Sequence, residues 1–268
     1  MYALIRSIVI SGLGVAALAG CADLDTDAPQ NASDDIVEAS DDAETDVASQ
    51  EQALHKDASR KDFNLDGRTD ILWHNPGSGV VNTWLLNGTT VVANPNVNWN
   101  VSGSSGWRAA GTGDFNADGK TDILWHHAGT GTVNVWLLNG RTVIGNPNIN
   151  WNVLGSSGWV LRGTGDFNND GRTDLLWHHA ASGQVNTWLL NGTTVIGNPN
   201  INWNVLGSSG WQLKGTGDFN KDGRTDLLWH HPGNGTVNTW LLNGTTVIGN
   251  PSLNWKVFGS SGWQIVSR

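Results

Sequence analysis

The sequence predicts an all-β fold, a β-propeller made of four-stranded blades, and three observations lead to this prediction. The motif Asp-Phe-Asn-x-Asp-Gly recurs every 52 residues, and all 16 Trp recur at four positions of the same unit. Each unit contains four short segments rich in β-branched and aromatic residues, and no useful stretch has a helical period. Four strands in about 50 residues match the size of a propeller blade. The four repeats span approximately residues 62–113, 114–165, 166–217 and 218–268.

The first repeat shows where its strands are expected. Residues 69–74 form the first strand, and residues 80–86 form the second, which ends at the hairpin signal Asn87-Gly88. Residues 89–92 return as the third strand, and residues 107–113 form the fourth, just before the next acidic motif. Apolar residues on both faces of these segments favour sheets that stack face to face.

The register of the repeats predicts how the ring closes. The first repeat begins at its acidic motif with no Trp-containing strand before it, whereas the last repeat ends with the extra segment Trp263-Gln264-Ile265-Val266. We expect this segment to complete the first blade and to close a single four-bladed ring. The alternative is that two chains combine into a larger ring. An open solenoid would carry capping units, and the sequence contains none.

The first 20 residues have the pattern of a signal peptide. Arg6 provides a positive charge, and residues 8–20 form an apolar run that is too short to span a membrane as a mature helix. The run ends in Leu-Ala-Gly-Cys, which resembles the lipobox of bacterial lipoproteins. The resemblance implies that Cys21 is acylated and anchors the chain, and Ala22 favours sorting to the outer membrane. A chance Cys after an ordinary signal peptide is the alternative.

Residues 21–59 are predicted to be a disordered, acidic tether, and residues 60–268 form the propeller. The tether is rich in Asp, Ala, Ser and Thr and contains no Trp, so it cannot bury enough apolar surface to fold. The single Cys of the chain excludes an internal disulfide framework.

The acidic motif predicts a calcium site in each repeat. Residues 62–70 place oxygen-bearing side chains at positions 1, 3, 5 and 9 and Gly at position 6, which permits a sharp turn. Hard cations such as Ca²⁺ require six to eight oxygen ligands, and Mg²⁺ would favour more water. Position 12 is Trp73 rather than the Glu of an EF-hand, so the loop belongs to a β-hairpin. An Asx-rich turn that binds no metal is the alternative. The expected ligands, with Arg and Lys contributing main-chain carbonyls, are Asp62, Asn64, Asp66, Arg68 and Asp70; Asp114, Asn116, Asp118, Lys120 and Asp122; Asp166, Asn168, Asp170, Arg172 and Asp174; and Asp218, Asn220, Asp222, Arg224 and Asp226.

The pattern D-x-N-x-D-G-x-x-D followed by an apolar strand resembles the FG-GAP/VCBS repeat family, the integrin-α-like propellers. The resemblance covers residues 60–268 and implies a propeller with calcium in a hairpin loop of each blade, about one Ca²⁺ per repeat. The chain departs from the family in having Gly111-Thr112-Gly113 before Asp114 and in offering four units, where family propellers usually have seven blades.

The net charge of −9 is concentrated before the repeats. Residues 22–61 hold twelve acidic and three basic residues, whereas residues 62–268 hold twelve Asp and eleven Lys or Arg. The acidic balance argues against a nucleic-acid partner, because phosphate contacts need clustered basic residues. Four bound Ca²⁺ would bring the repeat region to about +7, so an acidic polysaccharide is a reasonable ligand.

The repeats offer few candidates for catalysis. They contain no Glu, and all their Asp lie in the acidic loops, so no carboxylate pair is left for glycoside hydrolysis. No Gly-x-Ser-x-Gly motif occurs. Adjacent His residues such as His126-His127 point to opposite faces of a strand and cannot chelate one metal. We therefore predict that the protein is not an enzyme; a centre built from His residues or a metal near the ring axis is a distant alternative.

Most Trp are expected in the core, but one set lies in Asn-rich connectors, where aromatic faces and amides together suit sugar binding. This set is Trp99, Trp151, Trp203 and Trp255. Repeated sites would give avidity for a polyvalent glycan. The sequence thus predicts a surface-anchored, calcium-binding module for recognition of, or adhesion to, a glycan or protein. The membrane contact is a lipid anchor only, and a homodimer is an open alternative. A structural envelope lipoprotein, with the Trp as packing plugs, is the second interpretation.

Overall fold

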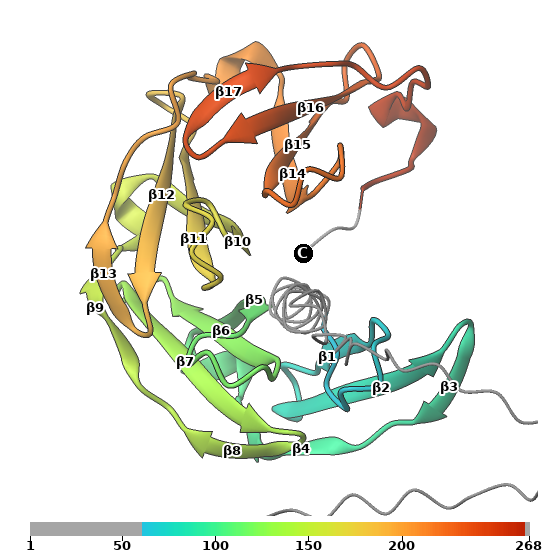
Figure 1. Cartoon of the computed structure of the whole chain (residues 1–268), viewed down its shortest axis with the longest axis vertical. Helices are drawn as coiled ribbons and strands as arrows, with labels where there is room; N and C mark the ends of the chain where they lie inside the picture. The colour runs from blue at the N-terminus through green and yellow to red at the C-terminus, as the bar shows by residue number, and fades with distance from the viewer. Residues whose placement is uncertain (1–60, 266–268) are drawn as a thin grey trace, which may run out of the picture. The chain divides into compact units, whose positions relative to one another are not determined.

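The computed structural model describes residues 61–265, and four antiparallel sheets in this region form a four-bladed β-propeller (Figure 1). The all-β class and the four repeats predicted from the sequence are therefore confirmed. The acidic tether, the signal peptide and Cys21 lie outside the described residues. No helix among residues 61–265 is long and apolar enough to cross a membrane.

Blades 2–4 each combine an inner strand of one repeat with the strands of the next repeat, whereas blade 1 contains strands of the first repeat alone. Blade 1 contains β1 (Ile71–His74), β2 (Val80–Asn87), β3 (Thr90–Ala93) and β4 (Asn96–Asn100). Blade 2 contains β5 (Trp107–Gly113), β6 (Asp122–His127), β7 (Thr132–Asn139), β8 (Thr142–Gly145) and β9 (Asn148–Asn152). Blade 3 contains β10 (Trp159–Gly165), β11 (Asp174–His179), β12 (Gln184–Asn191) and β13 (Thr194–Gly197). Blade 4 contains β14 (Gln212–Gly217), β15 (Asp226–His231), β16 (Thr236–Asn243) and β17 (Thr246–Gly249).

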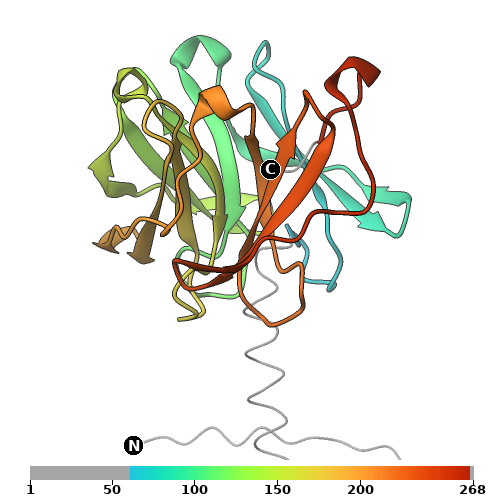
Figure 2. The same ribbon diagram turned by 90° about the horizontal axis from the view of Figure 1, so that it is seen from above.

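The turn chemistry of the sequence fixes the hairpins. Gly88 has a φ of 61°, in the left-handed region, and Asn87 pairs with Thr90, so the hairpin forms where the Asn-Gly signal predicts it, with Gly88 and Thr89 as the central residues of the turn. A single-turn 3-10 helix precedes the position of each inner strand: η2 (Gly103–Ser105), η3 (Gly155–Ser157), η4 (Gly207–Ser209) and η5 (Gly259–Ser261). These turns lie on one side of the disc, and the acidic loops lie on the other (Figure 2).

The connectors that hold the Trp99 set are more ordered than the sequence suggested. Trp99 lies in β4 and Trp151 lies in β9, and both strands pair with the long strand of their own blade. In blades 3 and 4 the same position is reduced to single bridges, such as Asn186 with Asn200. The side-chain amide of Asn82 donates to Asn96 Oδ1 at 2.8 Å, and the same bond joins Asn134 to Asn148 and Asn186 to Asn200.

The hydrophobic core lies between successive blades rather than within them. The cluster between blades 1 and 2 joins Phe63 and Val97 of the first repeat to Trp125 and Trp136 of the second. Equivalent clusters lie between blades 2 and 3 and between blades 3 and 4. Toward the centre, the inner strands β5, β10 and β14 lie next to one another, and Thr164 Oγ1 donates to the main-chain oxygen of Thr112 at 2.7 Å. Blade stacking therefore buries the apolar faces of the strands.

The four-bladed arrangement is confirmed, but the strand expected to complete blade 1 is not formed within residues 61–265. Residues 263–265 form no strand, Trp263 is largely exposed, and Val266 lies outside the described residues. Blade 1 thus has no inner strand on the free edge of β1. The three inter-blade clusters set the step from one blade to the next, and after three steps blade 4 and blade 1 stand apart (Figure 1).

Candidate functional site

The acidic loops precede β1 in blade 1 and the second strands β6, β11 and β15 in blades 2–4, and all four fold by the same hydrogen bonds. In the first loop, the amide of Asp66 donates to Asp62 Oδ1 at 3.2 Å and to Asn64 Oδ1 at 3.3 Å. The amide of Gly67 donates to Asp62 Oδ2 at 2.8 Å. Leu65 and Gly67 both have positive φ values, so the backbone turns tightly around these oxygens. The same bonds recur in the other three loops.

The Asp at position 9 ties each loop to its blade. Asp122 accepts from the amide of Phe115 through Oδ2 at 3.0 Å and from the amide of Leu138 through Oδ1 at 2.8 Å. Burial raises the pKa of Asp122 to about 7, although these two hydrogen bonds oppose the shift, and the carboxylates of Asp114 and Asp118 raise it further. The pKa of Asp174 is raised to about 7 for the same reasons. Each loop therefore holds a buried carboxyl group close to two other carboxylates.

The side chain at position 7 partly offsets this negative charge. Arg68 Nη1 lies 3.3 Å from Asp66 Oδ2, and Lys120 Nζ lies 3.3 Å from Asp118 Oδ2. These pairs are solvent-exposed, so each contributes little to stability. The donor set of three carboxylates, one amide oxygen and a main-chain carbonyl fits the chemistry that Ca²⁺ requires. Within residues 61–265, however, no three His, Cys, Asp or Glu side chains are gathered as a ready metal cluster, and the calcium sites stay a prediction.

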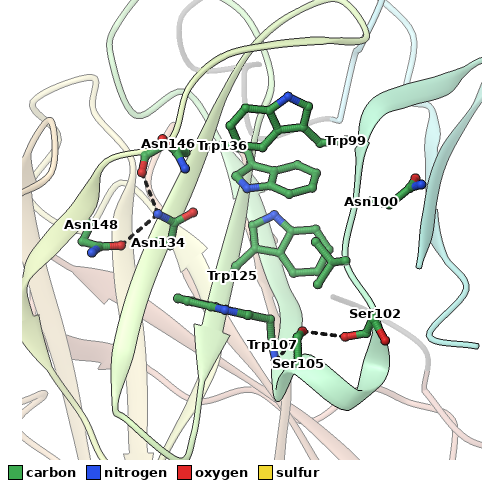
Figure 3. Close-up of a pocket in the computed structure, with 11 residues that line it drawn as sticks. Trp99, Asn100, Ser102, Ser105, Trp107, Trp125, Asn134, Trp136, Asn146 and Asn148 are labelled. Atoms are coloured by element: carbon green, nitrogen blue, oxygen red, sulfur yellow. Dashed lines mark hydrogen bonds between the residues drawn. The ribbon is translucent and has the colours of Figure 1, made fainter. Parts of the chain in front are cut away.

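A groove lined with Trp and Asn lies between blades 1 and 2 and has a volume of about 410 Å³ (Figure 3). Trp99 contacts Trp136 edge to face, with 5.6 Å between ring centroids, and Trp136 in turn packs on Trp125 at 4.9 Å. The groove is lined by Trp99, Asn100, Val101, Ser102, Ser105, Trp107, Trp125, Asn134, Trp136, Asn146 and Asn148. Its lining includes Ser105 of η2, and β5 runs from this 3-10 turn to the acidic loop at its other end, so the groove lies at the end of the blade away from that loop.

The four Trp proposed as ligand contacts fall into two environments. Trp99, Trp151 and Trp203 are each 40% exposed and pack edge-on against a Trp of the next blade. Trp255 is 77% exposed, since no blade follows blade 4. Three of the four therefore combine a packing role with an exposed face.

Polar groups in the grooves are unevenly satisfied. The side-chain amide of Asn134 donates to the main-chain oxygen of Asn146 at 2.8 Å and to Asn148 Oδ1 at 2.9 Å, as the dashed lines in Figure 3 show. The buried indole N–H groups of Trp125, Trp177 and Trp229 have no hydrogen-bond acceptor among the described residues. Unsatisfied buried donors are uncommon in folded proteins, and here they recur at the same position of blades 2, 3 and 4.

The His pairs take part in blade packing. Nε2 of His178 lies 2.8 Å from the main-chain oxygen of Val205, so this nitrogen is the donor, and the ring stands edge-on against Trp229 of the next blade. His126 contacts Val153 and Trp177 in the same way. Burial lowers the pKa of His178, and the hydrogen bond to Val205 opposes this shift.

Sequence reasoning missed two polar contacts that join neighbouring blades. Asn98 Oδ1 accepts from the amide of Val143 at 2.8 Å, and Thr121 Oγ1 donates to the main-chain oxygen of Asp62 at 2.9 Å. The first contact recurs at Asn150 and Asn202. The only signal in the sequence is that an Asn precedes the exposed Trp in every repeat.

Two segments of the chain, residues 62–125 and 166–229, match the model of the FG-GAP-like repeat. The chain carries FG-GAP-like repeats. Each match begins at the first Asp of an acidic loop and ends at a Trp of an inter-blade cluster, Trp125 or Trp229. The resemblance noted in the sequence is therefore confirmed. A search of curated proteins found no match.

Solved structures share only distant similarity with the FG-GAP-like repeat propeller. Virginiamycin B lyase from Staphylococcus aureus is 9% identical, with a TM-score of 0.38 over 70% of this chain and 53% of the lyase. A protein of unknown function from Bacteroides caccae is 14% identical, with a TM-score of 0.41 over 68% of this chain and 56% of that protein. The dihydro-heme d1 dehydrogenase NirN is 10% identical, with a TM-score of 0.35 over 69% of this chain and 35% of the dehydrogenase. The chain spans about half of the first two, and similarities this low carry no argument about activity.

Proposed function

We propose that this FG-GAP-like propeller is a recognition module that binds glycans in its inter-blade grooves and carries calcium in its acidic loops. Propellers with these repeats often serve as recognition or adhesion modules, and the family is generally non-enzymatic. The observation that carries the proposal is the groove in which an exposed Trp face lies among Asn side chains.

The groove has the two kinds of surface that a sugar ring requires. The face of Trp99 can stack on the apolar C–H face of a pyranose, and the neighbouring Asn100 offers both an amide donor and an acceptor to hydroxyl groups. A small number of polar groups in an aromatic pocket is the usual make-up of a ligand site. The same residue types recur between blades 2 and 3 and between blades 3 and 4, which supports multivalent binding to a polysaccharide.

Calcium would be held by the side-chain oxygens at positions 1, 3, 5 and 9 of each loop and by the main-chain carbonyl at position 7. When bound, the ion neutralises the clustered carboxylates and links the loop to the edge of its blade. The acidic loops lie on the side of the disc opposite the groove, so calcium in this proposal stabilises the propeller rather than contacting the sugar.

Surface anchoring in this proposal rests on the sequence of the first 21 residues. These residues lie outside the described part, and their lipobox-like pattern places an acylated Cys21 ahead of a long acidic tether. Metabolic labelling with a radioactive fatty acid, compared between the chain and Cys21→Ser, tests the anchor independently of ligand binding.

An array of neutral and acidic polysaccharides tests the glycan proposal. Asn100, Asn152 and Asn204 are exposed and occupy equivalent positions in three grooves, so Asn→Ala at all three removes sugar contacts without opening the core. Loss of one hydrogen bond per site lowers affinity about fivefold, and more on a multivalent surface. The matched control is Ala at Ile144, Ile196 and Ile248, which are exposed on outer strands. The absence of binding to all polysaccharides, or equal losses in both triple variants, contradicts the proposal.

A further inference from the structure

The two ends of the blade series expose apolar faces that are buried everywhere else in the propeller. On blade 1 we define the entry face as Ile71, Trp73, Trp84 and Val91, the positions that contact a preceding blade in blades 2–4. Trp73 is 46% exposed, whereas its equivalent in blade 2, Trp125, is 1% exposed. The entry face is therefore one half of an inter-blade interface without its other half.

Blade 4 exposes the complementary half. We define its exit face as Phe219, Leu253 and Trp255, the positions that contact the following blade in blades 1–3. Phe219 is 43% exposed, whereas Phe63 is 5% exposed at the same position of the first repeat. Open arrays of repeats usually end in polar capping surfaces, and these two faces keep the apolar residues of an internal interface.

The two faces retain the specific contact groups of an internal interface as well as its apolar residues. Between blades 1 and 2, His74 stands against Trp125, Trp99 against Trp136, Asn98 bonds Val143 and Thr121 bonds Asp62. Every partner exists on the free faces. The corresponding pairs are His230 with Trp73, Trp255 with Trp84, Asn254 with Val91, and Thr69 with Asp218.

One chain does not bring its own two faces together. Among the described residues, the strands of blade 4 make no contact with those of blade 1 comparable to the contacts between neighbouring blades. Figure 1 shows the opening between β14–β17 and β1–β4. The faces are complementary rather than identical, so contact between them joins chains head to tail.

We propose that the exit face of one chain packs on the entry face of a second copy, and that two such contacts close a two-fold symmetric dimer. Each contact between the chains would pair the same residue types as the interface that the chain already forms three times within itself. It covers both apolar faces and pairs each of the four contact groups named above. The proposal is independent of whether the propeller binds glycans or calcium.

Sedimentation velocity of the purified full-length chain, over about 0.1–100 µM, tests the proposal. We expect a concentration-dependent species of twice the chain mass of 28.7 kDa. Asn254→Ala removes an exposed side chain that takes no part in the fold of one chain, and it is expected to weaken the dimer about 25-fold, about fivefold at each of two contacts. Trp73→Glu should leave a folded monomer, whereas Ile144→Glu, at an exposed position away from both faces, should still dimerise.

Mixing distinguishes head-to-tail contact from other modes of association. Trp73→Glu blocks only the entry face, and Trp255→Glu blocks only the exit face, so each variant alone is expected to be monomeric. Their mixture retains one intact pair of faces and should form a weaker dimer. A wild-type chain that stays monomeric throughout overturns the proposal, as does a dimer that persists unchanged in Trp73→Glu and Asn254→Ala. Failure of the mixture to associate also overturns it.

Discussion

The contact between Asn150 and Val195 gives a direct measure of how strongly one blade holds the next. Asn150 Oδ1 accepts from the amide of Val195 at 2.8 Å, and Val195 is buried in the cluster between blades 2 and 3. Asn150→Ala leaves this amide without its acceptor. A buried donor left unpaired costs about 1–3 kcal/mol, and since Asn150 itself is exposed, water can reach part of the site. We therefore expect a loss of about 1–2 kcal/mol in the free energy of unfolding.

Urea unfolding followed by Trp fluorescence measures this loss. A domain of this size loses about 2–4 °C in Tm for each kcal/mol, so Asn150→Ala should melt about 2–8 °C lower with an unchanged urea m-value. Asn198→Ala is the matched control, because Asn198 is also an exposed Asn and no hydrogen bond to its side chain is present among the described residues. A loss below about 0.3 kcal/mol, or an equal loss in the control, would show that the Asn contact does not hold the blades together.

Two further predictions concern calcium and pH. Millimolar Ca²⁺ should raise the Tm relative to EGTA, because each occupied site adds about 2.7 kcal/mol to the free energy of unfolding when free calcium is 100 times its dissociation constant. Asp166→Ala should reduce this rise in Tm, whereas Asp57→Ala should leave it unchanged. Superimposable melting curves with and without calcium would reject the metal sites. Burial, together with the charges of Arg162 and His179, lowers the pKa of His178 below 6.5, so the unfolded chain binds the proton more readily than the folded one. The difference in the free energy of unfolding between the wild-type chain and His178→Gln should thus be greatest above about pH 6.5 and should decline as the pH falls toward the pKa of the folded state. A difference that stays constant from pH 8 to pH 5 would contradict the lowered pKa of His178.

The strands of a blade could be predicted from the sequence because each repeat carries enough local information. The 52-residue period, the Asn-Gly hairpins and the alternation of apolar residues each act over a few residues, and they placed β1–β3 close to where the structure has them. The buried Trp125 and Trp136 were also expected, because a Trp in a strand of a repeat protein packs against its neighbour. The composition of the acidic loops predicted their tight turns in the same way.

The contacts between blades were less predictable because they join residues far apart in sequence through one atom each. Nothing at Asn98 indicates that its side chain reaches Val143, 45 residues away, rather than a ligand. The His residues were similarly ambiguous, since the sequence indicated only that adjacent His side chains point to opposite faces of a strand. The structure places His178 edge-on to Trp229 instead, and this contact depends on the angle between two blades.

The same limit explains why the closing strand expected at residues 263–266 is not found among the described residues. A repeat encodes both halves of an interface, so Trp73 and Trp125 occupy the same position in nearly the same local sequence. One is half-exposed and the other is buried, and the difference comes only from whether another blade stands in front of it. The number of blades in a ring follows from the angle between neighbours, which is set by how Trp136, Phe63 and the Asn98 contact pack together. The four repeats therefore contain a surface that matches Trp73, namely the one that presents His230 and Trp255. They leave open which copy of the chain supplies it, and the mass of the particle in solution decides that point.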